Sequence, residues 1–560
     1  MIGRRYVAWL AVLGLVSLSA CPVSSPGGGS KRRYTKAPTA SDLEGVQLVT
    51  LDIEMSGPAA KRFGDPAPYS LTEVEQAVIA DLADEPMTHS PGLSRMVREL
   101  ASTTPDRINV PPSLVDGLMA WAGLVDPPPR LVVVEMPEDR HQCFRRLAPG
   151  CRSAVDSLVE QVRMTRPQTA PLDVGVGVVG LPDGRTRMMV AVLERAVQLE
   201  PLPTAVGREG SVTVAGRLLG PRSGPRVEVV NPGGRWHEVP ASVSVDGRFT
   251  ARVDCNEGSG AYQVEVLAEG SHGPEVAANF PVHCGVVPPD AITVVAEQLD
   301  PSVTAEQIAR ANFLYLNEER QARGLPALSW DPAAAVVAHG HSFDMHEHGF
   351  VGHRSPTTGD VTGRFSAAGL QGVVIRENVA RGYGPRGIHD SLMRSPGHRI
   401  NMLADDVTHV GVGVVVGAAE TDVPGAPRPV FATQNFYRKP GAGAPTKNLG
   451  PALQGRIDKR RREAGLAAVN WGAALGEVAQ RNAEAIGRGR QPPKDFEAKV
   501  FALGYDSVQS HRLSSIDFEA LAGVELWNTP VLEAGLGVVR TRERGGGEGF
   551  LAVVLVVTRE

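Results

Sequence analysis

Several common signatures of enzymes and binding proteins are missing from this chain of 560 residues. It has only five cysteines and no C-x-x-C pair, so a cysteine-based zinc site or redox motif has no support. It also has no P-loop, no G-x-S-x-G and no H-E-x-x-H, the signatures of phosphate-binding loops, serine hydrolases and zincin proteases. A net charge of −5 gives no indication of a nucleic-acid partner.

Aromatic residues are also scarce, at 5% of the chain, whereas hydrophobic residues reach 42%. That hydrophobic content is enough for several cores, and the length predicts three to five domains. The 62 glycines and 44 prolines exceed the usual share and favour many turns and linkers.

The start of the chain is typical of a bacterial lipoprotein. Arg4 and Arg5 precede an apolar run, 6–16, that is too short to span a membrane as a mature helix. Leu18-Ser19-Ala20-Cys21 then resembles a lipobox, in which Cys21 becomes the lipidated first residue; the alternative is an ordinary signal peptide. We therefore expect a signal peptide at 1–20 and a lipidated tether at 21–57, which anchors the protein in the bacterial envelope, at the outer membrane or cell surface.

The other four cysteines form two pairs that are close in sequence, as expected of disulfides in an oxidising compartment. Cys143 and Cys151 make one pair. Cys255 and Cys284 make the other, inside the segment 207–286, whose short alternating runs and Asp246-Gly247 turn predict an all-β, Ig-like sandwich. Residues 287–301 are expected to link this sandwich to the next domain.

A repeated strand pattern divides the rest of the chain. GVGVV occurs at 175–179 and 411–415, GLGVV occurs at 535–539, and a second apolar strand follows each. Glycines that alternate with valine predict a strand packed closely against a neighbouring element. Residues 318–325 also match 459–466, and Trp330 then matches Trp471. Similar units are thus predicted at 302–440, at 447–560 and, from weaker matches, at 58–203.

Only the central unit has a set of polar residues typical of a functional site, namely His353, Glu377 and His398. In the unit at 447–560 the offset from the shared glycine places Arg512 at the position of Glu377, and no S-P-G-H-R follows. The unit at 58–203 also lacks these signatures. Both outer units are therefore interpreted as degenerate copies.

The ordered motifs of the central unit resemble a CAP domain, from the superfamily of cysteine-rich secretory proteins, antigen 5 and pathogenesis-related proteins, in its bacterial SCP-like extracellular form. They are N-x-x-R-x-x-x-G-L-x-x-L-x-W-D (317–331), S-x-D-M (342–345), H-x-S-P-x-x-G (353–359), E-N-x-A (377–380) and S-P-G-H-R-x-N (395–401). The resemblance implies an α-β-α sandwich at 300–440 and a multidomain α+β chain. It also implies a cleft with two histidines, His353 and His398, and a first glutamate, Glu377. Ser395 stands where a second glutamate is expected, and Leu392 where a tryptophan is usual.

The residues leave three interpretations of this cleft open. Two neutral imidazoles bind a divalent metal such as Zn²⁺ through one nitrogen each, which makes a weak site with places for water. Glu377 would then orient a histidine or act as the catalytic base in a metal-dependent hydrolase or peptidase. The third interpretation is a buried hydrogen-bond network with a structural role.

Other charged side chains are expected on solvated surfaces. His341 and His348 lie on one face of a helix and form either a second metal site or a solvated helix end. Arg460-Arg461-Arg462 is expected to be a solvated face. The favoured function is a surface-anchored CAP module that binds a metal, lipid, peptide or cell-surface ligand, with metal-dependent hydrolysis as the alternative; the oligomeric state is left open.

Overall fold

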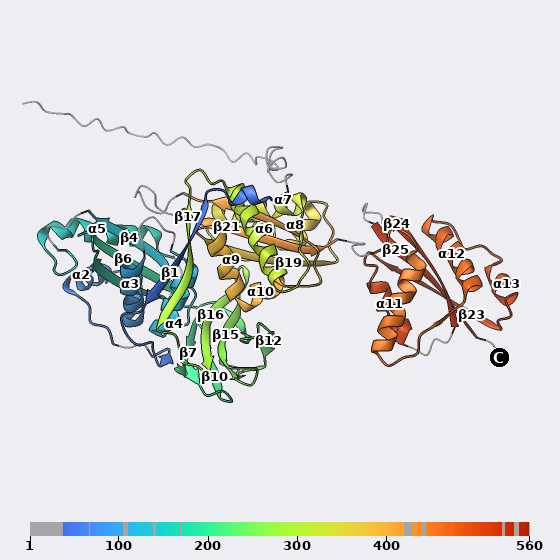
Figure 1. The fold of residues 1–560 in the computed structure, drawn as a ribbon, viewed down its shortest axis with the longest axis horizontal. Helices are drawn as coiled ribbons and strands as arrows, with labels where there is room; N and C mark the ends of the chain where they lie inside the picture. Colours follow the sequence, from blue (N-terminus) through green and yellow to red (C-terminus); the bar gives the residue numbers. More distant parts are fainter. Residues whose placement is uncertain are drawn as a thin grey trace, which may run out of the picture.

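The computed structural model of the chain describes residues 37–65, 68–104, 110–137, 142–167, 171–418, 428–439, 444–528, 533–542 and 548–558. The predicted signal peptide and the lipidation site Cys21 lie outside these residues. Among the described helices, none has the length and apolarity needed to span a membrane. The described residues form three mixed α/β units and one all-β unit (Figure 1).

The N-terminal α/β unit is built on a four-stranded sheet of order β3-β5-β6-β4. Strands β3 and β5 are parallel, and the other two pairs are antiparallel. The helices α3 and α4 lie on one face of this sheet, and α2 and α5 contribute to the core on the other. The elements are α2 (Glu73–Asp81), β3 (Met87–His89), α3 (Pro91–Thr103), α4 (Pro112–Ala122), β4 (Arg130–Met136), α5 (Arg152–Thr165), β5 (Leu172–Gly180) and β6 (Thr186–Glu194).

The all-β unit consists of a four-stranded sheet, β13-β14-β10-β7, and a five-stranded sheet, β12-β11-β15-β16-β9. Valines and aromatic residues of both sheets form one hydrophobic core between them. The Cys255–Cys284 disulfide is buried in this core, and the Cys143–Cys151 disulfide is buried in the preceding unit. The strands are β7 (Val197–Leu199), β9 (Ala205–Val206), β10 (Ser211–Leu218), β11 (Ser223–Val230), β12 (Trp236–Val239), β13 (Ala241–Val243), β14 (Arg248–Asp254), β15 (Gly260–Gly270) and β16 (Gly273–Cys284).

A two-stranded ribbon ties the N-terminal segment to the middle of the chain. Strand β1 (Val46–Glu54) pairs antiparallel with β17 (Ala291–Leu299) over its whole length (Figure 1). This differs from the tether expected at 21–57 and from the linker expected at 287–301. The physical reason is that Val49, Leu51 and Ile53 alternate along β1 and turn one face toward the neighbouring units.

The central unit repeats the sheet of the N-terminal unit, with the order β18-β20-β21-β19 and the same sense of each pairing. Its main core lies between this sheet and the helices α6, α9 and α10, and α7 covers the other face. The elements are α6 (Ala305–Ala322), β18 (Ser329–Trp330), α7 (Pro332–His348), α8 (Val361–Ala367), β19 (Val374–Gly382), α9 (Pro385–Arg394), α10 (Pro396–Met402), β20 (His409–Val416) and β21 (Val430–Arg438).

The C-terminal unit has the same sheet again, in the order β22-β24-β25-β23. It stands apart from the other units in Figure 1, although Arg438 of the central unit forms a 3.0 Å ion pair with its Asp517. The elements are α11 (Leu449–Glu463), β22 (Asn470–Trp471), α12 (Ala473–Gly487), α13 (Phe496–Phe501), β23 (Ser507–Ser515), β24 (Glu533–Arg542) and β25 (Glu548–Thr558).

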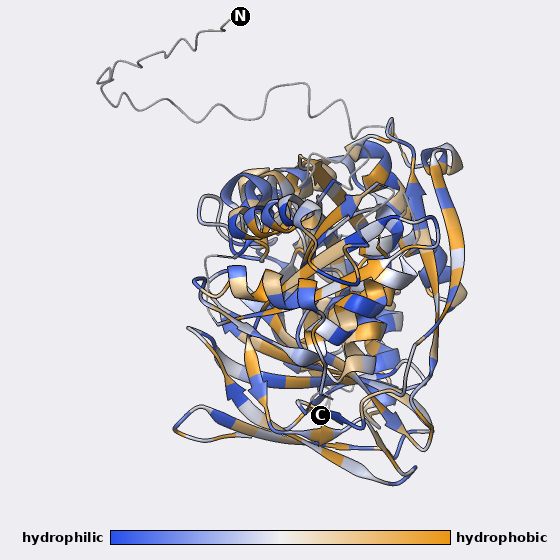
Figure 2. Ribbon diagram, turned by 90° about the vertical axis from the view of Figure 1, so that its left-hand side faces the viewer, coloured by the Kyte–Doolittle hydropathy of each residue, from blue (hydrophilic) through white to orange (hydrophobic). Residues whose placement is uncertain are grey.

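Close packing of a helix on the glycine-rich strand recurs in all three units, as the alternating glycines predict. A Cβ on Gly411 or Gly413 would overlap the backbone of α7, and Gly535 and Gly537 meet α12 in the same way. Gly175 and Gly177 meet α3. Because a larger side chain would push the helix away from the sheet, the pattern fixes the spacing between layers. Hydrophilic and hydrophobic stretches follow one another along several strands in Figure 2, and successive residues of β14 are exposed and buried in turn.

The strand registers correct one expectation about the C-terminal unit. Glu377 pairs with Asn435, which pairs with Gly411; the corresponding set is Ser510, Leu555 and Gly535. Ser510, and not Arg512, therefore occupies the position of Glu377.

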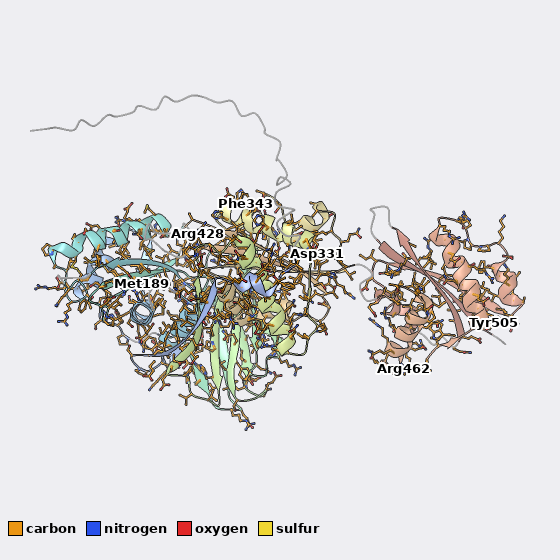
Figure 3. The ribbon with its side chains drawn as sticks, turned by 45° about the horizontal axis from the view of Figure 1, so that its top comes forward. Met189, Asp331, Phe343, Arg428, Arg462 and Tyr505 are labelled. Carbon is orange, nitrogen blue, oxygen red and sulfur yellow. A yellow bond between two sulfur atoms is a disulfide. The ribbon has the colours of Figure 1, made fainter. Side chains whose placement is uncertain are left out.

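Arg461 is also not part of a solvated face. Its guanidinium is buried and donates to the carbonyl oxygens of Ala467 and Trp527. Arg462, by contrast, is exposed and lies at the outer edge of the unit (Figure 3). Arg320 makes the equivalent bond in the central unit, to Pro326, so the match between the two units extends to this buried arginine.

Candidate functional site

Glu377 is the centre of one half of the candidate site. It lies on β19 with a side chain that is only 2% exposed. His353 Nδ1 is 3.1 Å from its Oε1, and Arg364 Nη2 donates to its Oε2 at 2.6 Å. In the amide orientation that satisfies both of its groups, Asn435 of β21 also donates to Oε2, at 3.1 Å. Both carboxylate oxygens are thus engaged by donors.

The electrostatics of this half favour an ionised carboxylate. Burial alone would raise the pKa of Glu377, but the hydrogen bond from His353 and the charge of Arg364 outweigh it, so the pKa lies below its usual value. Arg364 also donates to the carbonyl oxygen of His353 and thereby holds the loop after α7 against α8. The loop, the strand and α8 are joined through one buried ion pair.

His341 belongs to the same cluster and not to a solvated helix end. It is fully buried on α7, and its Nε2 lies 2.9 Å from the carbonyl oxygen of Gly352 and 4.0 Å from Glu377 Oε1. Burial lowers its pKa, against the opposing effect of Glu377. His348 instead pairs with Asp344 at 2.9 Å, on the outer part of the helix. The two histidines therefore do not form a common metal site.

His398 is the centre of the other half. It lies on α10, directly after the Ser395-Pro396 turn at which α9 ends. Its Nδ1 is 2.7 Å from Ser395 Oγ, and Asn378 of β19 donates to its carbonyl oxygen at 3.1 Å. Burial, followed by the nearby charge of His353, lowers the pKa of His398 to about 3, so the ring is neutral at physiological pH.

Ser395 connects this half to a different domain. Its hydroxyl donates to Glu265 Oε1 of β15 at 3.1 Å, and the backbone N–H of Gly397 donates to the same oxygen at 3.3 Å. Glu265 is fully buried, and burial raises its pKa to about 8. The position at which a second glutamate is expected is therefore occupied by a serine that contacts a glutamate of the all-β unit.

The two imidazoles present the donor set of a weak metal site. Hydrogen bonds engage Nδ1 of both His353 and His398, whereas Nε2 of neither ring has a hydrogen-bond partner among the described residues. Rings fixed through one nitrogen and open at the other are the usual state of histidine ligands. No group of three or more His, Cys, Asp or Glu side chains in the described parts of the chain is arranged to hold a metal ion. A metal held by these two rings would therefore have an incomplete, two-nitrogen shell.

Three members of the site were not found from the sequence. Arg364 is an isolated arginine in a short helix, His341 appeared among exposed histidines, and Glu265 lies far upstream in another domain. Of these three residues, only His341 had a signal in the sequence. It directly precedes the S-x-D-M motif, whose Ser342 and Met345 are buried in the structure.

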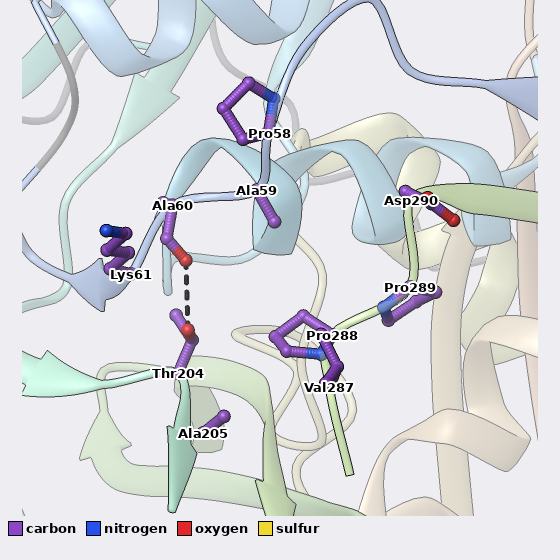
Figure 4. A pocket seen from close by; sticks show the side chains of 10 residues that line it. All are labelled: Pro58, Ala59, Ala60, Lys61, Thr204, Ala205, Val287, Pro288, Pro289 and Asp290. Atoms are coloured by element: carbon purple, nitrogen blue, oxygen red, sulfur yellow. Dashed lines mark hydrogen bonds between the residues drawn. The ribbon is translucent and has the colours of Figure 1, made fainter.

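The pockets described below lie away from these histidines. One, of about 790 Å³, is lined by residues 58–61, Thr204, Ala205 and 287–290, where Thr204 Oγ1 donates to the carbonyl oxygen of Ala60 at 2.9 Å (Figure 4). The second, of about 330 Å³, lies beside α10 and is lined by Trp236, Arg376 and Arg399 among others.

Comparison with known proteins identifies the central unit. Residues 313–436 match the family model of CAP, the cysteine-rich secretory protein family. Two proteins of Bacillus subtilis (strain 168) each align over 100 residues, or 18% of this chain: the uncharacterized membrane protein YlbC at 38% identity and the uncharacterized protein YkwD at 36%. The chain spans only 29% and 39% of their lengths.

Solved structures of similar proteins include an extracellular protein with an SCP domain from Bacillus anthracis. It is 21% identical with a TM-score of 0.21, over 41% of this chain and 78% of that one. An outer surface protein from Borrelia burgdorferi is 18% identical with a TM-score of 0.22, over 24% and 96% of the two chains. The identification rests on the family match: residues 313–436 of this chain form a CAP domain of the cysteine-rich secretory protein family.

Proposed function

We propose that the cleft between His353 and His398 binds a divalent metal such as Zn²⁺, and through it a ligand, without catalysing a reaction. The observation that carries this proposal is the shared geometry of the two rings. Each is held through Nδ1, by Glu377 or by Ser395, and each keeps Nε2 for a ligand. When bound, the metal would supply a Lewis-acidic centre with open positions for water or a ligand donor.

The hydrolase alternative, with Glu377 as general base, has less support. A general base needs a free lone pair and a pKa near the working pH. Glu377 Oε1 faces His353 and Oε2 accepts from Arg364, while its pKa is lowered. Its contacts suit a carboxylate that orients an imidazole.

We also infer that the units at 58–203 and 447–560 are degenerate CAP copies. The inference is supported by the same strand order in all three sheets and by the same pair of strand glycines against a helix. The all-β unit, with its two sheets around one core, supports an Ig-like spacer between them. Together with lipidation of Cys21, this arrangement describes an envelope-anchored binding protein.

The test of metal binding is a calorimetric Zn²⁺ titration of the full chain. We expect one weak saturable site, and at least about tenfold weaker binding in His353→Ala and His398→Ala. His511→Ala is the matched control, because His511 occupies the register position of Asn378 in the C-terminal unit and should leave the site intact. Absence of saturable heat, or equal heat in all variants, contradicts the proposal.

The anchor is tested separately by palmitate labelling in a bacterial host. The wild-type chain should incorporate label and Cys21→Ser should not; unchanged labelling of the variant refutes lipidation at this residue.

A further inference from the structure

The all-β unit is docked against the central unit beside the candidate site. At the tip of the β15–β16 hairpin, His272 accepts from the backbone N–H of Arg354 at 2.8 Å and stacks on Phe350 with ring centroids 4.5 Å apart. Arg354 is the residue next to His353. Farther along β15, Glu265 contacts Ser395 and Gly397, beside His398. The β15–β16 hairpin of the all-β unit therefore reaches both histidine halves of the candidate site.

Glu265 is held in this position by several donors. Its Oε1 accepts from Ser395 Oγ and Gly397 N, and its Oε2 accepts from Asn279 Nδ2 at 2.9 Å. Glu228 is its cross-strand neighbour and bonds with the indole of Trp236. Since Glu265 is fully buried at the contact, it is a component of the domain interface and not a surface carboxylate.

The direction of the hydrogen bonds fixes the protons of His398. A backbone N–H can only donate, so Glu265 Oε1 is the acceptor for Gly397. Ser395 gives its single hydroxyl proton to the same oxygen, so the proton that the raised pKa of Glu265 leaves on this carboxyl belongs to Oε2. The 2.7 Å contact between Ser395 Oγ and His398 Nδ1 then requires the ring to donate, and Nδ1 carries the proton. In a neutral imidazole, Nε2 is consequently the nitrogen with the free lone pair.

We propose that Glu265 of the all-β unit is a positioning residue of the CAP cleft: acting through Ser395, it holds neutral His398 as the Nδ1–H tautomer, so that Nε2 is the nitrogen available to a ligand. It thereby replaces, from a separate domain, the carboxylate that the turn before α10 lacks at Ser395. This inference deepens the proposed metal binding and rests on it for its functional consequence, whereas the tautomer itself is a property of the metal-free chain.

The test is ¹⁵N NMR of the full chain with ¹⁵N-labelled histidine, without metal. We expect His398 of the wild type to show a protonated Nδ1 and an unprotonated Nε2. Ser395→Ala and Glu265→Ala should shift the ring toward the Nε2–H form or an exchange average, because the Nδ1 proton loses its acceptor chain. Glu265→Gln retains a carbonyl oxygen at the same place and should restore the wild-type tautomer.

Glu297→Gln is the matched control. Glu297 is also a buried carboxylate at a domain contact and accepts from the backbone N–H groups of Arg386 and Gly387 on α9, away from His398. It should leave the His398 signals unchanged. A wild-type His398 in the Nε2–H form, or a tautomer that stays the same in Glu265→Ala and Ser395→Ala, overturns the proposal. Circular dichroism of each variant establishes that it is folded.

A Zn²⁺ titration of the same variants separates this inference from metal binding itself. If the wild type binds, Glu265→Ala should bind about 10- to 100-fold more weakly, and Glu265→Gln within a few-fold of the wild type. Tautomer control without any Zn²⁺ binding would contradict only the proposed function. Metal binding with an unchanged tautomer in Glu265→Ala would contradict only the role of Glu265.

Discussion

The central CAP unit and the C-terminal unit share a fold, called the frame below, but only the central unit has the polar cluster around Glu377. Both have the same strand order, a helix packed on two strand glycines, and a buried arginine that donates six residues ahead. At the position of the Glu377–Asn435 pair, however, the C-terminal unit has Ser510 and Leu555. The N-terminal unit has Leu131 and Ala191 at the same register position. The fold therefore does not depend on the polar cluster, which can be exchanged for apolar or neutral residues.

The largest loss of stability is expected from substitutions at the strand glycines. Gly413→Val and Gly537→Val each place methyl groups inside the backbone of a helix that is packed on the sheet. We expect each to lower the free energy of unfolding of its own unit by more than about 4 kcal/mol, enough to remove its cooperative transition in calorimetry.

The control for these variants is Gly340→Ala. A Cβ at this helical position meets open space, so alanine should stabilise the unit by about 0.5–1 kcal/mol. Equal losses at Gly340 and Gly413 would show that close packing is not what the strand glycines provide.

It should be possible to replace the polar cluster without losing the fold of the central unit. Arg364→Met leaves the buried carboxylate of Glu377 without its cation, and we expect a loss of about 3 kcal/mol at pH 7 by urea denaturation. The double variant Arg364→Met/Glu377→Leu, which imitates Leu131 of the N-terminal unit, should recover most of that loss. A double variant less stable than Arg364→Met would mean that the central frame depends on its polar cluster.

The contribution of Glu377 to the stability of the wild type should decrease in acid. The pKa of Glu377 is lowered in the folded chain, so its contribution is present above pH 4.5 and is lost as the pH falls through the folded pKa. The difference between wild type and Arg364→Met should therefore shrink in acid.

The domain contact should respond to pH in the opposite direction. The pKa of Glu265 is raised from 4.5 to about 8, mainly by burial, and also by neighbouring Glu228. The folded chain then binds more protons than the unfolded chain, so the free energy of unfolding falls as the pH rises from about 5 to 8. The slope for one such proton is at most about 1.4 kcal/mol per pH unit. Denaturation of Glu265→Gln should show a flatter pH profile; an identical slope would assign the effect to another group.

The smallest effect is expected at the exposed part of α11. Arg462→Ala should change the free energy of unfolding by less than about 0.5 kcal/mol, because the side chain lies in solvent (Figure 3). Arg461→Ala, one residue earlier, should cost about 2 kcal/mol, since it leaves two buried carbonyl groups without a donor. Thermal melts of the two variants provide the comparison, and similar shifts would contradict the buried role of Arg461.

The sequence predicted those features that depend on local pattern. The strand glycines, the match of Trp330 with Trp471 and the ordered motifs around His353, Glu377 and His398 all come from short segments. The two disulfides are present as paired in the sequence. The family match at 313–436 confirms the CAP domain.

The contacts that complete the site join distant segments and have no local pattern. Arg364 acts because the loop after α7 folds back onto α8, and Glu265 acts because β15 is docked beside α10. The ribbon of β1 and β17 was missed for the same reason, although the alternation of Val49, Leu51 and Ile53 was available. Sequence offsets also fail where loop lengths differ. The offset placed Arg512 at the position of Glu377, whereas the strand register places Ser510 there, two residues earlier.

The central claim is that the polar site can be removed while the fold is kept. Its most direct test is a Zn²⁺ titration of the Arg364→Met/Glu377→Leu variant beside the wild type. We predict a folded variant, with a free energy of unfolding close to that of the wild type, that binds at least about tenfold more weakly because His353 has lost the carboxylate that orients it. Undiminished Zn²⁺ binding in the folded variant, or a variant that no longer folds, would contradict this separation of frame and site.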